Sequence, residues 1–253
     1  MLYFNMNVRQ KKLIEKLHKL ERLSIEEEAV IFKVAPMTIR RDIQLFEKQG
    51  IAIRTHGGAV PRISEPAQLF IQPDASAAQK KIARKALELI PDDCNLMLSA
   101  GTTTLEVARQ LAASDLRICV ITNSLPVAAV LFQTKIQVIL TGGSLRNNSL
   151  DLIGPVTEKN LDEYYIDLLI TGCDGASAEE GFFTKDLNLA EMEKKSVKKS
   201  SRTIIVTESH KFRKPAFVKF ASMTEVSTVI TDKKLSGEDA SKITKSGIEL
   251  VLV

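Results

Sequence analysis

The chain has 253 residues, of which 44% are hydrophobic, and a formal net charge of +4 at pH 7. This length is typical of two domains. No run approaches the ~18 consecutive apolar residues that a membrane-spanning helix needs, and no secretory signal peptide is recognisable. We therefore expect a cytoplasmic protein with no membrane partner. Residues 1–5 fit poorly with the pattern that follows them, and Met6 could equally serve as the start.

Three helices are predicted within the first fifty residues. Apolar residues at helical spacing mark the first helix, from about residue 9: Leu13, Ile14, Leu17 and Leu20. Ser24 and Glu27 predict a capping box, in which the Ser side chain caps a second helix and the Glu side chain reaches back to the Ser backbone. That helix runs to about Phe32. Residues 33–35 form a turn of the length found in helix-turn-helix motifs.

The third predicted helix has the features of a helix that reads DNA. Pro36 suits its first position, because the φ angle of proline is already helical and its missing N–H would be unpaired there. An apolar stripe recurs at i, i+4 and i+7: Ile39, Ile43 and Phe46. Side chains outside this stripe, in the first turns, would meet bases and phosphates. The predicted DNA contacts are Pro36, Met37, Thr38, Arg40, Arg41 and Gln44. An ordinary amphipathic surface helix fits the same pattern, and the flanking sequence decides between the two.

A two-stranded wing is predicted next. Gly50 ends the third helix at the C′ position, and residues 51–54 alternate as a short strand. Residues 56–58 form a turn, and residues 59–60 begin the return strand. Three helices and a hairpin make a winged helix-turn-helix, in which Arg54 and His56 would lie on the wing, close to the phosphate backbone.

Positive charge is concentrated in this first region. Residues 1–62 carry twelve Lys or Arg and seven Asp or Glu, a net charge of +5, which leaves −1 for the rest of the chain. A basic module joined to a nearly neutral body is expected of a protein that binds nucleic acid. We therefore predict a DNA-binding domain over residues 6–61.

The same region resembles a known family. VAPMTIRRDI followed by FEKQGIAIRTHGGA is similar to the DeoR family of bacterial transcription regulators. The resemblance implies sequence-specific binding to double-stranded operator DNA. One position departs from the family pattern, since Ala35 stands where a Ser usually caps the recognition helix. Loss of such a cap costs about 0.5–2 kcal/mol of local stability.

Two further features limit the possible classes of protein. Residues 61–76 hold three prolines without a clear period, which predicts a linker over residues 62–76. Cys94, Cys119 and Cys173 are widely spaced, and each lies in or beside an apolar stretch, so we expect reduced, buried thiols. None of them pairs with a His at metal-ligand spacing, and neither a metal site nor a cofactor is predicted.

From residue 77 to residue 253, helix and strand patterns alternate. Strands are expected at residues 95–98, 118–121, 136–140, 165–170, 203–207, 226–230 and 248–252. Helices are expected at residues 82–90, 105–111 and 187–200, with others up to residue 131 and between the last two strands. This alternation predicts a largely parallel, Rossmann-like sheet covered by helices on both faces. The fold class is α/β, with a winged helix-turn-helix followed by this second domain.

Polar or Gly-rich loops follow five of these strands, after Leu98, Ile121, Leu140, Ile170 and Val206. Ligands of parallel sheets bind beyond the carboxyl ends of the strands, so five such loops predict a pocket. The most informative of these loops is residues 99–104. It places free backbone N–H groups at a helix N-terminus, where phosphate binds readily. A simple Thr-capped helix start fits this loop as well, and Lys211 could be an ordinary surface lysine.

The resemblance to the DeoR family continues through SAGTTTLEVARQL, VITNSLPVAAVL, ILTGGSLRNNSLDLIGP, TGCDG and ESHK, and so covers nearly the whole chain. It implies a homo-oligomer, dimeric or tetrameric, whose sensor domain at residues 77–253 is similar in fold to ribose-5-phosphate isomerase and glucosamine-6-phosphate deaminase and binds a phosphorylated sugar. Residues 101–104 would hold the phosphate. The implied effector contacts are Lys81, Ser99, Gly101, Thr102, Thr103, Thr104, Asn123, Ser124, Gly142, Gly143, Asp174, Glu208 and Lys211.

Two of these positions depart from the family pattern. Ser99 stands where an Asp is usual, and Glu208 stands where the Asp of a D-x-x-K pattern is usual. The first change removes an acceptor for sugar hydroxyls, and the second places a carboxylate further out. Recognition of a different metabolite and loss of sensing are both open.

Three functions are compatible with the sequence. The first, which the sequence favours, is a repressor of a carbohydrate uptake or catabolism operon that a phosphorylated sugar releases from its operator. Such release requires the effector to have different affinities for two states of the protein. The second is a sugar-phosphate isomerase or deaminase with an appended DNA module, which needs a positioned base. Asp174 and Glu191 are the candidate bases, and His210 is the only histidine in this domain. The third is a scaffold whose second domain only oligomerises.

Overall fold

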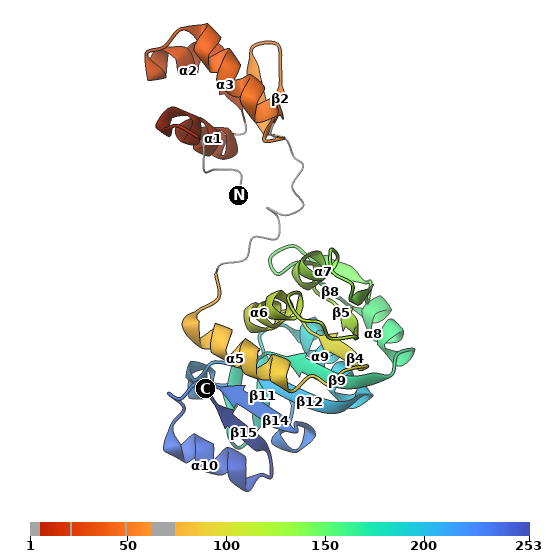
Figure 1. Ribbon diagram of the computed structural model, residues 1–253. Helices are drawn as coiled ribbons and strands as arrows, with labels where there is room; N and C mark the ends of the chain where they lie inside the picture. The colour runs from red at the N-terminus through yellow and green to blue at the C-terminus, as the bar shows by residue number, and fades with distance from the viewer. Residues whose placement is uncertain (1–5, 21, 49, 62–73) are drawn as a thin grey trace. The chain divides into compact units, whose positions relative to one another are not determined.

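The computed structural model describes residues 6–20, 22–48, 50–61 and 74–253 (Figure 1). They fall into two compact units, residues 6–61 and residues 74–253. Residues 1–5 and most of the predicted linker, residues 62–73, lie outside the described residues. Among the helices in the described part of the chain, none is both long enough and apolar enough to cross a membrane.

The first unit is a winged helix-turn-helix, as predicted. Its elements are α1 (Val8–Leu20), β1 (Leu23–Ser24), α2 (Ile25–Phe32), α3 (Pro36–Lys48), β2 (Ala52–Arg54) and β3 (Gly58–Pro61). The predicted stripe of Ile39, Ile43 and Phe46 is fully buried, and it shares a core with Leu13 and Leu17 of α1. The helical period of these apolar residues therefore fixes which face of α3 points inward.

The wing contains a third strand that the sequence did not predict. β1 pairs antiparallel with β3, so that the strand order is β1-β3-β2. Two residues are too few to show the alternation by which a strand is recognised. Ser24 at the end of β1 caps α2 by accepting a hydrogen bond from the Glu27 amide at 3.4 Å. Between these two residues, only this half of the predicted capping box is formed.

Two buried carboxylates fasten α1 to the other two helices. Asp42 of α3 accepts hydrogen bonds from Arg9 Nε and Gln10 Nε2, both at 2.8 Å. Glu28 of α2 lies 2.8 Å from Lys16 Nζ. Both carboxylates are almost fully buried, and breaking a buried ion pair typically costs about 3–5 kcal/mol. Arg9 and Lys16 therefore serve the fold, although both were counted in the basic excess.

The second unit is built on a seven-stranded sheet, which confirms the predicted α/β class. Its strands are β4 (Asn95–Leu98), β5 (Cys119–Thr122), β6 (Gln137–Leu140), β9 (Ile166–Thr171), β12 (Ser200–Val206), β14 (Thr228–Thr231) and β15 (Glu249–Leu252). The order is β15-β14-β12-β9-β4-β5-β6, and every neighbouring pair is parallel.

Helices cover both faces of this sheet (Figure 1). The helices α5 (Ala77–Glu88), α6 (Thr102–Leu111) and α7 (Leu125–Leu131) pack on one face, and α8 (Pro155–Asp162), α9 (Leu187–Lys199) and α10 (Gly237–Lys245) pack on the other. Successive residues of β4 alternate between the two cores. Leu96 and Leu98 contact the first group of helices, and Met97 contacts the second. A strand buried on both faces in this way has no polar side, which explains its continuous apolar run.

Several short elements of the second unit were not predicted from the sequence. They are a hairpin of β7 (Ser144–Arg146) and β8 (Asp151–Ile153), the helix α8, a small antiparallel sheet of β10 (Gly175–Ser177), β11 (Gly181–Thr184) and β13 (Val218–Ala221), and the 3-10 turns η1 (Ser209–Arg213) and η2 (Met223–Glu225). Each strand has three or four residues, too few for a periodic signal.

The order of the strands creates a switch point. The chain adds β5 and then β6 on one side of β4, and it returns to place β9 on the other side. The loops after β4 and β9 therefore diverge, and they leave a crevice at the carboxyl ends of these two strands. Ligands of open α/β sheets bind at such a point.

We predict that Gly58→Ala destabilises the first unit and that Gly57→Ala does not. A Cβ atom at Gly58 would collide with the backbone carbonyl of Leu23 in β1, whereas nothing lies within 4 Å of a Cβ at Gly57. Overpacking of this kind costs about 1–3 kcal/mol. In thermal unfolding of the full chain, the transition of the first unit should be lowered by Gly58→Ala and not by Gly57→Ala. Equal behaviour of the two variants would contradict the close approach of β1 to β3.

Candidate functional site

The outer face of α3 presents the predicted DNA contacts to solvent. Pro36, Met37, Arg40, Arg41 and Gln44 are exposed, and Thr38 is partly exposed. Within the described residues the two arginines form no salt bridge, so that their charge is available to a partner. The helix begins without a side-chain cap from Ala35, whose carbonyl accepts the Thr38 amide at 2.8 Å.

The wing adds two further exposed polar side chains. Arg54 ends β2, and His56 lies in the turn that the Thr55 amide closes by donating to the Gly58 carbonyl at 3.0 Å. β2 packs against α3, so the cations of the wing and of the helix belong to one rigid module. In winged helix-turn-helix proteins of this geometry, the helix enters a groove of DNA and the wing contacts the DNA backbone.

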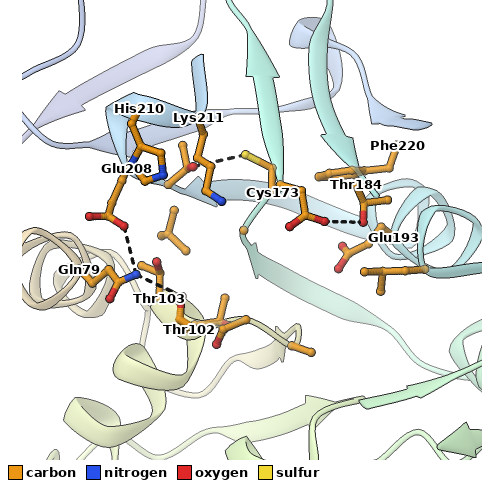
Figure 2. A pocket seen from close by; sticks show the side chains of 18 residues that line it. Gln79, Thr102, Thr103, Cys173, Thr184, Glu193, Glu208, His210, Lys211 and Phe220 are labelled. Carbon is orange, nitrogen blue, oxygen red and sulfur yellow. Dashed lines mark hydrogen bonds between the residues drawn. The ribbon is translucent and has the colours of Figure 1, made fainter. Parts of the chain in front are cut away.

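A cavity of about 370 Å³ lies at the switch point of the second unit. Figure 2 shows its side chains. They come from the loops after β4, β9 and β12, from the helices α5, α6 and α9, from β11 and β13, and from η1. We call it the switch-point cavity. It is lined by Gln79, Ala100, Gly101, Thr102, Thr103, Thr104, Gly172, Cys173, Asp174, Thr184, Leu189, Glu193, Val206, Thr207, Glu208, His210, Lys211 and Phe220.

One side of the cavity is the N-terminus of α6. Gly101 is the N-cap and supplies no side-chain acceptor to the first-turn amides. Thr104 Oγ1 donates to the Gly101 carbonyl at 2.9 Å, and Thr102 Oγ1 accepts from Gln79 Nε2 at 3.1 Å. Lys211, from η1, lines the same cavity. Open amides at the positive end of a helix, with an ammonium group nearby, form an arrangement that binds an anion.

Glu208 is held in place by α5. Its two carboxylate oxygens accept hydrogen bonds from Ser76 Oγ at 3.0 Å and from Gln79 Nε2 at 3.1 Å. Ser76 and Gln79 also form the capping box of α5. The longer Glu side chain, noted above as a departure, thus reaches a helix cap at the edge of the cavity.

Glu193 of α9 is the main residue that the sequence analysis missed. It is only 4% exposed, and its Oε2 accepts hydrogen bonds from Thr171 Oγ1 at 3.0 Å and Ser99 Oγ at 3.4 Å. Burial raises the pKa of Glu193 to about 7, against hydrogen bonds that lower it. A charged residue on the buried stripe of an amphipathic helix, level with Ala190 and Val197, was the signal that could have revealed it.

Asp174 and Cys173 also line the cavity. Asp174 Oδ2 accepts hydrogen bonds from Thr184 Oγ1 at 3.1 Å and from the Lys185 amide at 3.0 Å. The Cys173 thiol donates to Thr207 Oγ1 at 3.3 Å, and burial raises its pKa to about 12. This thiol is therefore protonated and unsuited to act as a nucleophile.

Several predicted effector contacts support the loops and do not line this cavity. Asn123 is fully buried, and its Oδ1 accepts the Ala100 amide at 3.1 Å. Ser99 is also fully buried and faces Glu193. Gly142 and Gly143 form a turn against α8, where the Gly142 carbonyl accepts Thr157 Oγ1 at 2.6 Å. These four residues therefore hold the loops in shape.

Ser124 and Lys81 do not line the switch-point cavity. Ser124 caps α7 and, together with Arg146, lines a neighbouring hollow that shares Gly101 and Asp174 with the cavity. Lys81 is exposed on α5 and lines neither space. Of the predicted effector contacts, the structure brings together in this cavity Gly101, Thr102, Thr103, Thr104, Asp174, Glu208 and Lys211.

The candidate catalytic groups are dispersed. Asp174 and His210 line the cavity, whereas Glu191 is exposed on α9 and forms an ion pair with Lys194 at 2.7 Å. Within residues 6–20, 22–48, 50–61 and 74–253, no group of three or more His, Cys, Asp or Glu side chains is placed to hold a metal ion.

Comparison with known proteins matches both units. Residues 9–64 match the family model of the DeoR-like helix-turn-helix domain, and residues 74–233 match that of the DeoR C terminal sensor domain. The chain is 29% identical over 253 residues to a putative aga operon transcriptional repressor of Escherichia coli O157:H7, covering 97% of this chain and 93% of the relative. It is 32% identical over 228 residues to the glycerol-3-phosphate regulon repressor of Escherichia coli K12, covering 88% and 90%.

Among solved structures, ribose 5-phosphate isomerase A from Methanocaldococcus jannaschii is similar over 53% of this chain and 52% of that chain, with 19% identity and a TM-score of 0.39.

We predict that Glu193→Gln stabilises the protein at high pH. The pKa of Glu193 in the folded state, about 7, lies above its ordinary value of 4.5. The folded state therefore binds this proton more tightly than the unfolded state, and the wild type loses stability as the pH rises from about 4.5 to about 7. The difference is at most on the order of 3 kcal/mol.

Thermal unfolding of both proteins between about pH 5 and about pH 8 checks this. The advantage of Glu193→Gln should grow with pH, whereas Glu191→Gln, which removes an exposed carboxylate of the same helix, should show no such growth. A constant difference between Glu193→Gln and the wild type would show that Glu193 stays ionised throughout.

Proposed function

This chain belongs to the DeoR family of helix-turn-helix transcriptional regulators, and from that premise we propose that it represses a carbohydrate operon and is released from its operator by a phosphorylated sugar. The observation that carries this proposal is the combination of two separate sites in one chain. The first unit contains a helix and a wing with exposed cations, and the second contains a cavity at a switch point, lined by the α6 N-terminus and Lys211.

The DNA-binding half of the proposal rests on α3 and the wing. Arg40 and Arg41 are exposed outside the buried stripe, and Arg54 extends the cationic surface along the wing. Because the internal ion pairs occupy Arg9 and Lys16, these three arginines are the exposed cations best placed to meet DNA. Repressors of this kind bind two half-sites as dimers, and we propose that this chain self-associates to do so.

The effector half rests on the switch-point cavity. Its volume of about 370 Å³ is at the lower end of the range for small-molecule sites, which suits a monosaccharide phosphate. The first-turn amides of α6 and the Lys211 ammonium would receive the phosphate, and Asp174 and Glu208 offer oxygens to hydroxyl groups. A regulator is favoured over an enzyme because the relatives named above are transcriptional repressors.

We expect Arg40→Ala and Arg41→Ala each to weaken binding to a specific site by about 1–3 kcal/mol, roughly 5- to 150-fold, since a base or phosphate contact of α3 is lost. The site is first selected by the wild-type chain from a random double-stranded library, and affinity is then measured by fluorescence anisotropy over a salt series. Arg84→Ala removes an exposed cation from α5 of the second unit and is the matched control. An equal loss for Arg84→Ala would indicate a non-specific charge effect and contradict the assignment to α3.

We expect Lys211→Ala to weaken the effector about 10-fold or more, because a charge-assisted hydrogen bond is worth about 1.5–3 kcal/mol. The measurement is the concentration of sugar phosphate that releases the selected DNA. Lys81→Ala is the control, since this lysine is exposed outside the cavity. Equal losses for the two variants would move the phosphate site toward α5. If no phosphate ester in a broad panel altered DNA binding, the effector half would fall and the DNA-binding half would stand.

A further inference from the structure

The switch-point cavity carries more negative than positive side chains. Asp174, Glu193 and Glu208 line it, against one lysine, Lys211, and one histidine, His210. A phosphate group would add further negative charge to this space. Like charges a few ångströms apart in a partly enclosed site repel each other strongly. A phosphate ester that also carries a positive charge would reduce this repulsion.

The three carboxylates differ in how the protein satisfies them. Each oxygen of Glu208 has a side-chain donor, Ser76 or Gln79. Glu193 is more deeply buried, and both of its donors, the hydroxyls of Thr171 and Ser99, bond to Oε2. Within the described residues Oε1 of Glu193 accepts no hydrogen bond, and the side chain lines the cavity. Oε1 is not enclosed by protein atoms, although the residue as a whole is only 4% exposed. An accessible acceptor on a side chain that lines a cavity is placed to receive a donor from a ligand.

No protein cation compensates this carboxylate. In the described part of the chain Glu193 forms no salt bridge. Asp151 raises its pKa, and Arg146 lowers it by less. Arg146 is itself bonded to Asp151 at 2.6 Å and lies 3.3 Å from Asp186. A buried carboxylate without a positive partner is costly, which is why burial raises the pKa of Glu193 to about 7.

The proposed phosphate site at the α6 N-terminus and Glu193 lie on different sides of the cavity. Figure 2 shows Gln79, Thr102 and Thr103 on one side, Glu193 beside Thr184 on the other, and Lys211 entering from η1. A ligand that fills the space would therefore place its phosphate and its Glu193 contact at separate positions. Two separate contact positions suit a molecule with a negative group at one position and a positive group at another.

We propose that Glu193 receives the protonated amino group of the effector, so that the pocket selects an amino sugar phosphate over the corresponding hydroxyl sugar phosphate. The inference rests on the phosphate site proposed above, at α6 and Lys211. The ammonium group would donate to Oε1 and supply the positive charge that the protein lacks. A charge-assisted pair of this kind is about twice as strong as a neutral hydrogen bond.

The test is calorimetric titration of the full chain with glucosamine 6-phosphate and glucose 6-phosphate, which differ only in an amino or hydroxyl group at one carbon. The same comparison uses galactosamine 6-phosphate and galactose 6-phosphate, to cover the other ring stereochemistry. We expect the wild type to bind at least one amino compound about 10-fold or more tightly than its hydroxyl partner. Glu193→Gln keeps the size and the acceptor oxygen but not the charge, and it should lose this preference. Glu191→Gln, on the exposed face of the same helix, should keep it.

A second measurement is the number of protons released when the ligand binds. Pairing with an ammonium group favours the ionised carboxyl, so binding near pH 6.5 should release protons from Glu193, seen as a dependence of the binding enthalpy on the buffer. The phosphate group, whose second pKa is about 6, also releases protons when it binds to a cationic site. Glu193→Gln should therefore show a smaller release than the wild type. Equal affinity of wild type for amino and hydroxyl partners, with binding still lost in Lys211→Ala, would overturn this inference and leave the phosphate site standing. Retention of the preference in Glu193→Gln would also overturn it. If no phosphate ester bound the wild type, both proposals would fall.

Discussion

The order in which strands join the parallel sheet is the constraint on which the cavity depends. Because β5 and β6 are added on one side of β4 and β9 on the other, the connections that leave β4 and β9 run in opposite directions. The space between them cannot be closed by a shared loop. Residues as distant in sequence as Gln79, Thr102, Asp174 and Glu208 meet there. The α6 N-terminus points into this space because α6 follows β4 after a loop of three residues.

Three buried carboxylates show how the same side chain serves different purposes in the two units. Asp42 and Glu28 have cationic partners at 2.8 Å, and they hold α1 against the helix-turn-helix. Glu193 is as deeply buried, yet in the described residues it has only hydroxyl donors. The paired carboxylates stabilise a scaffold. The unpaired one is costly in the empty pocket, and in the proposal made above a positive group of the effector would offset this cost.

The loops at the carboxyl ends of the strands contain two kinds of polar residue. Thr102 and Asp174 face the cavity, whereas Asn123 and Ser99 bond to the backbone or to Glu193 and keep these loops in place. The proposed phosphate site would need both kinds, because its amides must be held to a fraction of an ångström. The resemblance of the chain to its family indicated both kinds together and did not separate them.

The sequence by itself determined the two-unit organisation, the buried stripe of α3, the strands of the parallel sheet and the Gly-Thr loop before α6. These features depend on periodicity and local residue preference, which act over a few residues and can be read along the chain. The sequence did not reveal β1, the β7–β8 hairpin or the small antiparallel sheet, because their strands are shorter than one readable period. Only the tertiary structure decided which polar residues face the cavity. Glu193 lies 94 residues from its donor Ser99. The helical period of α9 indicates that Glu193 is buried, but no local pattern reports its hydroxyl donors, the missing cation or the open oxygen.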